Sequence, residues 1–283
     1  MKKILLTGST GFIGSHLLKE LSKNYIIYIT LRTKTKKILK NKNVIKIYFN
    51  NYETLNRKLK KLKVNVVIHC ATHYVKYHNF ENLKKLGNSN ILFGNVILEN
   101  LEIMGARKFI NFSTVWENYN GIKDNYFNLY SVYKANFSRI VNLYKKKLTN
   151  ISFLNLVISD TFGGNDKRIK IINLLKNNYK KNIQTKIISK NLYLNLLNVV
   201  DIKNAVILIL KHKYKSGSYL LANKTDFKIL HIIKQINKIS KKKIKVKWLS
   251  NKIIKEKIYK YNILKQWKPL NSKIQDIIDV ITG

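Results

Sequence analysis

The chain has 283 residues, of which 45% are apolar, so it is long enough to bury the core of one large domain. Its formal net charge of +41 comes from 55 lysines and arginines, but only five of these are arginines and the lysines are spread over the whole length. A specific nucleic-acid binder concentrates arginine and aromatic residues in one patch. The charge therefore predicts a solvated surface that attracts anionic ligands such as nucleotides, with no specific nucleic-acid partner.

Cysteine use and hydropathy predict where the protein works. Cys70 is the single cysteine, which excludes an intrachain disulfide and favours a reducing compartment. The first apolar run breaks at once at Gly8, so it is too short for a signal peptide. No stretch approaches the roughly eighteen uncharged apolar residues of a membrane span. We expect a cytoplasmic protein.

A glycine-rich turn follows the first predicted strand. Ile4–Leu6 is short and apolar, and glycines stand at 8, 11 and 14, where a helical apolar pattern begins. Strand, glycines and helix in this order are typical of a dinucleotide-binding loop, although such a turn can also precede an ordinary surface helix. We expect Gly8 to form the tight turn, Gly11 to admit a pyrophosphate, and Gly14 to let the helix pack closely on the strand. The predicted cofactor-binding residues of this loop are Gly8, Thr10, Gly11, Phe12, Ile13 and Gly14.

Short apolar strands alternate with helices up to about residue 160. Further strands are predicted at 25–31, 44–49, 64–69, 108–113 and 151–157, and helices at 52–63, 88–104 and 130–148. This alternation predicts an α/β fold with a Rossmann-type, doubly wound parallel sheet in an NAD(P)-binding domain, residues 1–160.

Beyond residue 160 the alternation loosens. We expect a helix at 168–178, a helix that Asp201 begins and Lys211 ends, a strand at 218–222, a helix capped by Thr225 and a strand at 243–249. No proline- or serine-rich linker separates the two parts. Residues 161–283 are therefore predicted to form a smaller substrate-binding lobe packed on the first domain, and strand 218–222 is a candidate to rejoin the main sheet.

Arg32 bears on the choice of dinucleotide. NAD-binding folds place a carboxylate about twenty residues past the glycine loop, where it binds the ribose hydroxyls. Counting from Gly11 leads instead to Arg32, with Lys34 close behind. A guanidinium fork suits a 2′-phosphate, so the sequence favours NADP(H), with NAD(H) as the alternative.

A Tyr-x-x-x-Lys pair on a helix can carry proton transfer, because both side chains share one face and the ammonium lowers the phenol pKa. The pair occurs at Tyr119, Tyr130 and Tyr261, which is as often as chance predicts for 17 tyrosines. Tyr119 lies in a polar loop and Tyr261 lies in the predicted C-terminal lobe. Tyr130 and Lys134 open a helix after the fifth strand, which ends in Ser113-Thr114. Position therefore selects Tyr130 with Lys134 as the catalytic candidates.

Several motifs stand in a recognisable order: Thr-Gly-Ser-Thr-Gly-Phe-Ile-Gly at 7–14, Val-Ile-His-Cys-Ala-Thr at 67–72, Ser113-Thr114, Tyr130/Lys134 and Trp267-Lys268-Pro269. In this the chain resembles the extended short-chain dehydrogenase/reductases, the NAD-dependent epimerase/dehydratase family of nucleotide-sugar enzymes. Within that family it is most similar to bacterial CDP-linked 4-keto-6-deoxyhexose reductases of the abequose-synthase type.

The resemblance implies roles for individual residues. Thr114 would orient the substrate oxygen, Tyr130 would be the general acid/base, and Lys134 would bind the nicotinamide ribose and tune Tyr130. Cys70, Ala71 and Thr72 would line the dinucleotide. Family members often form homodimers.

Departures from the family pattern narrow the reaction. Its dehydratases carry Asp-Glu directly after the catalytic threonine, whereas here Val115 and Trp116 follow and Glu117 comes one position late. The arginine that commonly binds the sugar diphosphate is absent, with Leu194 near its place and Arg168 as a candidate substitute. The sequence thus predicts NADP-dependent reduction of a nucleotide-activated 4-keto-6-deoxy sugar for surface polysaccharides. The alternatives are a nucleotide-sugar 4-epimerase and a non-catalytic dinucleotide-binding regulator.

Histidines near the fourth strand suggest a metal site only superficially. His69, Cys70, His73 and His78 are close in the sequence. Adjacent strand residues point to opposite faces of a sheet, which separates His69 from Cys70. We predict no metal site.

Overall fold

The computed structural model describes residues 1–32, 41–164 and 166–283, and these residues form two compact units. Unit 1 comprises Met1–Val157, Ile209–Leu220 and Tyr259–Ile263. Unit 2 comprises Ile158–Leu208, Leu221–Ile258 and Leu264–Gly283. Two short segments from the C-terminal half of the chain therefore belong to unit 1.

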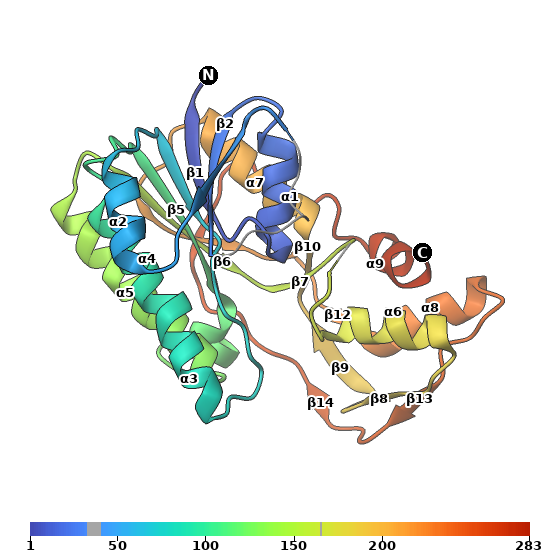
Figure 1. Ribbon diagram of the computed structural model, residues 1–283. Helices are drawn as coiled ribbons and strands as arrows, with labels where there is room; N and C mark the ends of the chain where they lie inside the picture. Colours follow the sequence, from blue (N-terminus) through green and yellow to red (C-terminus); the bar gives the residue numbers. More distant parts are fainter. Residues whose placement is uncertain (33–40, 165) are drawn as a thin grey trace. The chain divides into compact units, whose positions relative to one another are not determined.

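The described part of unit 1 is built around an eight-stranded sheet of order β15-β11-β6-β5-β4-β1-β2-β3 (Figure 1). Its strands are β1 (Lys3–Thr7), β2 (Ile26–Leu31), β3 (Val44–Tyr48), β4 (Val66–His69), β5 (Lys108–Thr114), β6 (Ser152–Ile158), β11 (Gly217–Leu221) and β15 (Asn262–Ile263). Strands β3, β2, β1, β4 and β5 pair in parallel. The strand order reverses between β1 and β4, which is the switch point where such sheets bind ligands. The predicted doubly wound parallel sheet is confirmed.

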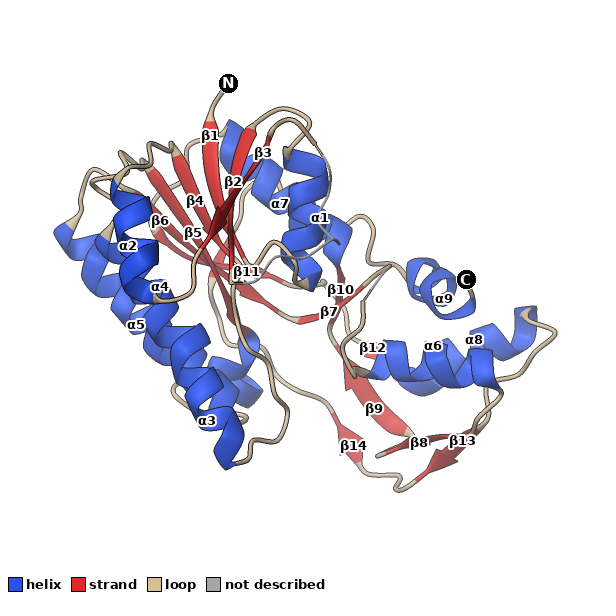
Figure 2. Ribbon diagram, in the orientation of Figure 1, coloured by secondary structure: helices blue, strands red, loops and turns tan. Residues whose placement is uncertain are grey.

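Helices cover both faces of this sheet. They are α1 (Phe12–Leu21), α2 (Tyr52–Lys60), α3 (Phe80–Gly87), α4 (Phe93–Glu99) and α5 (Leu129–Lys147). Helices α2, α4 and α5 lie on one face and α1 lies on the other (Figures 1 and 2). Alternate strand residues point to opposite faces, so Leu5, Val67 and Phe109 pack together on the side of α2, α4 and α5.

The helix predicted at 88–104 differs from the structure at both ends. The chain is helical from Phe80, passes through a π-helical segment at Asn88–Leu92 (η1), and ends at Glu99. The first turns escaped prediction because they carry few buried apolar side chains: Leu86 is buried, but Phe80 is 88% exposed. The pattern persists to Met104 because that residue is buried in the turn after the helix.

Unit 2 is a mixture of short strands and helices (Figure 2). In its described residues β7 pairs with β10, β13 pairs with β8, and β9 lies between β12 and β14. The strands are β7 (Asp160–Phe162), β8 (Thr185–Ile187), β9 (Asn191–Leu194), β10 (Leu196–Asn198), β12 (Phe227–Lys228), β13 (Val246–Trp248) and β14 (Ile253–Ile254). The helices are α6 (Ile171–Lys181), α7 (Val199–Lys211), α8 (Ile229–Ile239) and α9 (Ile274–Thr282). Isoleucines of α6, α8 and α9 form the core of this unit.

Three predicted helix starts in this half are wrong. Helix α6 begins at Ile171, three residues after the predicted start. Lys228, not Thr225, precedes the first residue of α8. Asp201 lies inside the first turn of α7, which begins at Val199. The buried Asp201 carboxylate instead accepts hydrogen bonds from the Leu270 and Asn271 backbone N–H groups and, at 2.6 Å, from the Ser272 hydroxyl. It ties α7 to the segment before α9.

Replacing Asp201 by Asn is expected to destabilise unit 2 by about 2–3 kcal/mol, because an amide cannot accept at both former oxygens and the charge-assisted bonds are lost. Urea unfolding followed by circular dichroism measures this. The control is Asp279→Asn on the exposed face of α9, where the amide oxygen can still accept from Gln275. Equal unfolding midpoints for the two variants would contradict the prediction.

Candidate active site at the carboxyl edge of the main sheet

The glycine loop between β1 and α1 is closely packed against neighbouring backbone atoms. Gly8 has φ +65°, and a Cβ added there would lie 2.6 Å from the Ala71 backbone nitrogen. A Cβ at Gly14 would lie 2.1 Å from the Gly8 carbonyl oxygen, against 3.2 Å for one at Gly11. Gly8 thus needs the left-handed region, and Gly14 is in backbone contact with the turn.

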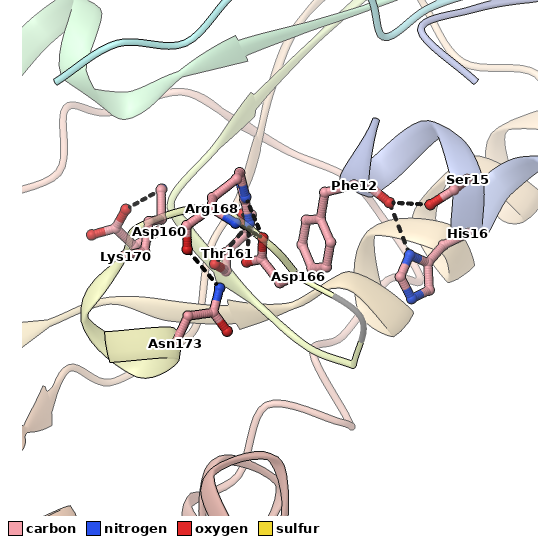
Figure 3. Close-up of polar contacts among 9 residues, drawn as sticks. All are labelled: Phe12, Ser15, His16, Asp160, Thr161, Asp166, Arg168, Lys170 and Asn173. Atoms are coloured by element: carbon pink, nitrogen blue, oxygen red, sulfur yellow. Dashed lines mark hydrogen bonds and ion pairs between the residues drawn. The ribbon is translucent and has the colours of Figure 1, made fainter. Parts of the chain in front are cut away.

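The loop leaves polar groups for a ligand. Thr10 and Gly11 are exposed, and Phe12 and Ile13 begin α1, whose first N–H groups lack carbonyl partners within the helix. The Ser9 hydroxyl is buried and has no hydrogen-bond partner among the described residues. Orphan donors at a helix N-terminus fit the pyrophosphate of a dinucleotide. Figure 3 shows how the Phe12 carbonyl accepts from Ser15 and His16 on the next turn of this helix.

The segment after β4 lies beside this loop at the switch point. Ala71 N–H donates to the Thr7 hydroxyl at 3.3 Å, and Cys70 N–H donates to the Thr7 carbonyl. Thr72 donates its hydroxyl to the Asn90 side chain at 3.1 Å. Asn90 also accepts from the His73 N–H at 2.7 Å. The predicted dinucleotide-lining residues therefore stand next to Gly8, and the buried Asn90, which sequence reasoning missed, anchors them.

Arg32 directly follows β2 and is exposed. Its guanidinium donates to the Tyr52 hydroxyl at 3.1 Å and lies 5.9 Å from the centre of the Phe93 ring. Tyr52 in turn donates to the Asn88 carbonyl. These contacts hold the guanidinium at the carboxyl end of β2, while Lys34 lies outside the described residues.

Thr114, Tyr130 and Lys134 come from the end of β5 and the first turns of α5. Asn128 caps α5 through Ser131, so the helix starts just before Tyr130. Tyr130 is half-buried and edge-on to Tyr74, and Lys134 follows one turn later with only 4% exposure. Thr114 thus ends a strand at the same edge of the sheet as the glycine loop, and Tyr130 and Lys134 lie in the first two turns of the helix that follows.

Burial sets the charges around Lys134. It lowers the Lys134 pKa to about 8, and the negative charge of Glu117 opposes this shift. It also lowers the His69 pKa to about 3, so His69 is neutral and bonds Thr7 at 3.0 Å. Desolvation raises the Cys70 thiol pKa. Lys134 is thus the cation of this buried group.

The other two Tyr-x-x-x-Lys pairs occupy different surroundings. Tyr119 lies in the 3₁₀ segment Val115–Gly121 (η2) after β5. Tyr261 belongs to unit 1, not to the C-terminal lobe as predicted, because its hydroxyl accepts from the Asn118 amide at 2.7 Å. Burial raises the Tyr261 pKa, which disfavours it as a proton carrier.

Arg168, the candidate for the sugar diphosphate, lies in unit 2. Figure 3 shows its guanidinium beside Asp166 and Thr161. The guanidinium donates to the Asp166 carboxylate at 2.8 and 2.7 Å and to the Thr161 hydroxyl. Lys170 pairs with Asp160 at 2.7 Å beside it. Asp166 therefore fixes the orientation of the Arg168 fork.

The residues that the structure describes contain neither a cluster of metal ligands nor a membrane-spanning helix. No group of three His, Cys, Asp or Glu side chains is arranged to hold a metal ion. None of the helices there is both long and apolar enough to cross a membrane.

Known proteins share this sequence pattern and fold. The model of the NAD dependent epimerase/dehydratase family matches residues 4–222. CDP-abequose synthase of Yersinia pseudotuberculosis is 29% identical over 84% of both chains. CDP-abequose synthase of Salmonella muenchen is 25% identical over 77% of this chain and 73% of its own.

Solved structures agree on the fold. UDP-glucuronic acid 4-epimerase from Bacillus cereus, in complex with UDP-glucuronic acid and NAD, has a TM-score of 0.80 at 21% identity, covering 99% of this chain and 97% of its own. dTDP-glucose 4,6-dehydratase from Bacillus anthracis, in complex with NAD, has a TM-score of 0.81 at 18% identity, covering 99% and 96%. With the family model matched over most of its length, the chain belongs to the NAD dependent epimerase/dehydratase family and is an enzyme of the extended short-chain dehydrogenase/reductase type.

Proposed function

We propose that this enzyme uses NADPH to reduce the keto group of a nucleotide-activated 4-keto-6-deoxy sugar destined for surface polysaccharide. The observation that carries the proposal is the buried Lys134, one helical turn from Tyr130 in the helix after β5. Relatives named CDP-abequose synthase, which cover most of the chain, support a sugar nucleotide as the substrate.

The proposed chemistry needs one proton and one hydride. When bound, the dinucleotide supplies the hydride to the keto carbon. Tyr130 donates its phenolic proton to the keto oxygen, which becomes the hydroxyl, and the Lys134 ammonium stabilises the phenolate left behind. Thr114 donates a hydrogen bond to the same oxygen and orients it.

We expect the glycine loop (Gly8, Thr10, Gly11, Phe12, Ile13 and Gly14), together with Cys70, Ala71 and Thr72, to hold the dinucleotide. Arg32 would bind the 2′-phosphate. Dehydration is disfavoured, because the Glu117 side chain is buried and hydrogen-bonded to Ser113 and Ser138 and is not exposed at the edge of the sheet.

A substrate screen tests the proposal. CDP-, dTDP-, UDP- and GDP-linked 4-keto-6-deoxy sugars are mixed with enzyme and NADPH, and absorbance at the reduced-nicotinamide band is followed with product analysis. Net oxidation of NADPH with at least one substrate is expected. An epimerase would interconvert sugars without consuming cofactor, and a regulator would turn over none of them.

Arg32→Ala is expected to weaken NADPH binding by about 10- to 100-fold, the loss of one charge-assisted contact, while NADH affinity stays within about twofold. Fluorescence titration of both cofactors measures this, with Arg57→Ala on the exposed face of α2 as the matched control. The assignment of Arg32 to the 2′-phosphate fails if the wild type binds NADH as tightly as NADPH and Arg32→Ala changes neither affinity.

A further inference from the structure

Glu117 is a buried carboxylate close behind the proposed catalytic pair. It is 6% exposed and lies in η2, three residues after Thr114. Its Oε2 accepts from the Ser113 hydroxyl at 2.8 Å and from the Ser138 hydroxyl at 3.2 Å. A carboxylate this deep is retained only where donors or a cation compensate it.

The helix register brings this carboxylate to the catalytic face. Tyr130, Lys134 and Ser138 are spaced four apart on α5, so they form one row on the helix surface. Ser138 and Ser113 also bond each other at 3.3 Å, which joins this row to the end of β5. Glu117 therefore binds the strand that carries Thr114 and the helix turn that follows Lys134.

Glu117 supplies the negative charge that acts on Lys134. The charge of Glu117, from η2, raises the Lys134 pKa against the effect of burial, and Lys134 in turn helps to lower the pKa of His69 at the end of β4. Burial keeps His69 neutral and the Cys70 thiol protonated, so neither offers an anion. Burial raises the Glu117 pKa, while the two serines, Lys134 and Arg139 lower it. Glu117 in turn helps to raise the pKa of Tyr261.

We propose that Glu117 is a positioning residue of the reaction: its carboxylate, held by Ser113 and Ser138 beside the row of Tyr130 and Lys134 on α5, is the buried counter-charge that keeps Lys134 protonated. The proposal rests on the proposed function only in that Tyr130 and Lys134 carry the proton transfer. It assigns to Glu117 a task distinct from acid/base attack on substrate, since the side chain faces the two serines and the lysine.

Glu117→Gln tests this, because the amide keeps the shape and an acceptor for the serines but loses the charge. Without the carboxylate the Lys134 pKa falls further, so the ammonium is lost at lower pH. The alkaline limb of the kcat–pH profile is expected to move down by about one pH unit, giving about fivefold lower kcat at pH 8 and about tenfold lower kcat well above it. Glu117→Asp keeps the charge and should restore most of the profile.

The matched control is Glu99→Gln, which removes an exposed carboxylate that accepts from Tyr144 near the other end of α5. It should leave the profile unchanged. Glu117→Met, of similar length, replaces the Gln variant if that variant is unstable. The inference is overturned if the folded variant that lacks the charge, Glu117→Gln or Glu117→Met, keeps the wild-type alkaline limb of the kcat–pH profile.

A second readout does not depend on turnover. Enzyme labelled with ¹³C at lysine Cε is titrated by NMR, and Lys134 is assigned from its absence in Lys134→Met. Its midpoint is expected near the value of about 8 in the wild type and lower in Glu117→Gln. An unchanged midpoint contradicts the inference. If no 4-keto sugar is reduced, the proposed function fails, and this titration still decides what Glu117 does to Lys134.

Discussion

Tyr130→Phe is expected to lower the turnover of 4-keto sugar reduction by about 100- to 10,000-fold, the usual contribution of a general acid. The ring and its edge-on contact with Tyr74 remain, so the local packing is kept. Because the phenolic proton is absent, the keto oxygen must take its proton from water. NADPH affinity, measured by fluorescence titration, should stay within about twofold, since Lys134 is intact.

The control for this variant is Tyr144→Phe on the same helix. Tyr144 donates to Glu99 and lies fourteen residues further along α5, about 20 Å away at the helical rise. Its loss should leave kcat unchanged. Tyr261→Phe tests whether the catalytic pair is instead Tyr261 with Lys265. If Tyr261→Phe abolishes turnover while Tyr130→Phe does not, Tyr261 is the general acid and the assignment of Tyr130 is wrong.

Gly14→Ala is expected to disrupt the dinucleotide loop. The new methyl would lie 2.1 Å from the Gly8 carbonyl oxygen, a backbone atom that cannot rotate away. The start of α1 must therefore shift, at a cost of about 1–3 kcal/mol in unfolding free energy. The shift misplaces N–H donors aimed at the pyrophosphate, so NADPH binding should weaken by about 10- to 100-fold. Urea unfolding and fluorescence titration measure the two effects.

Two other glycines calibrate this result. A Cβ at Gly87 meets nothing within 4 Å and Gly87 has helical backbone angles, so Gly87→Ala should raise the unfolding free energy by up to about 1 kcal/mol and leave binding unchanged. A Cβ at Gly11 lies 3.2 Å from the same carbonyl and fits with a small adjustment. Gly11→Ala should therefore weaken binding more than it weakens folding. Equal behaviour of the Gly14 and Gly87 variants would mean that α1 does not need its close contact with the turn.

Local sequence features predicted β1 to β6 and β11 of the main sheet because each is short, apolar and followed by a turn, whereas the two-residue strand β15 was not predicted. The same features predicted the glycine loop, whose positive φ at Gly8 and backbone contact at Gly14 follow from the spacing of strand, glycine and helix. The start of α5 was predicted within one residue, because its apolar pattern and position agree. These are properties of neighbouring residues.

Contacts between distant segments were not predictable in the same way. Asp201 read as a helix start because aspartate favours that place, but its carboxylate binds Leu270–Ser272, about seventy residues away, and no local pattern encodes such a pairing. Tyr261 was assigned to the wrong part of the chain for the same reason, since its bond to Asn118 closes a long loop. Thr225 was displaced as a cap by Lys228, where strand β12 ends.

By itself, the sequence determined the parallel sheet and the glycine loop, since apolar periodicity and glycine spacing follow from local backbone geometry, and the resemblance of its motifs to known enzymes indicated the family. Only the tertiary structure decided that Glu117 turns inward to Ser113 and Ser138 near Lys134. In the sequence that glutamate stands one position away from a dehydratase residue, and nothing local tells which way it faces. The direction depends on how α5 packs against β5, because Ser138 of α5 and Ser113 of β5 together supply the hydrogen bonds that a buried carboxylate needs.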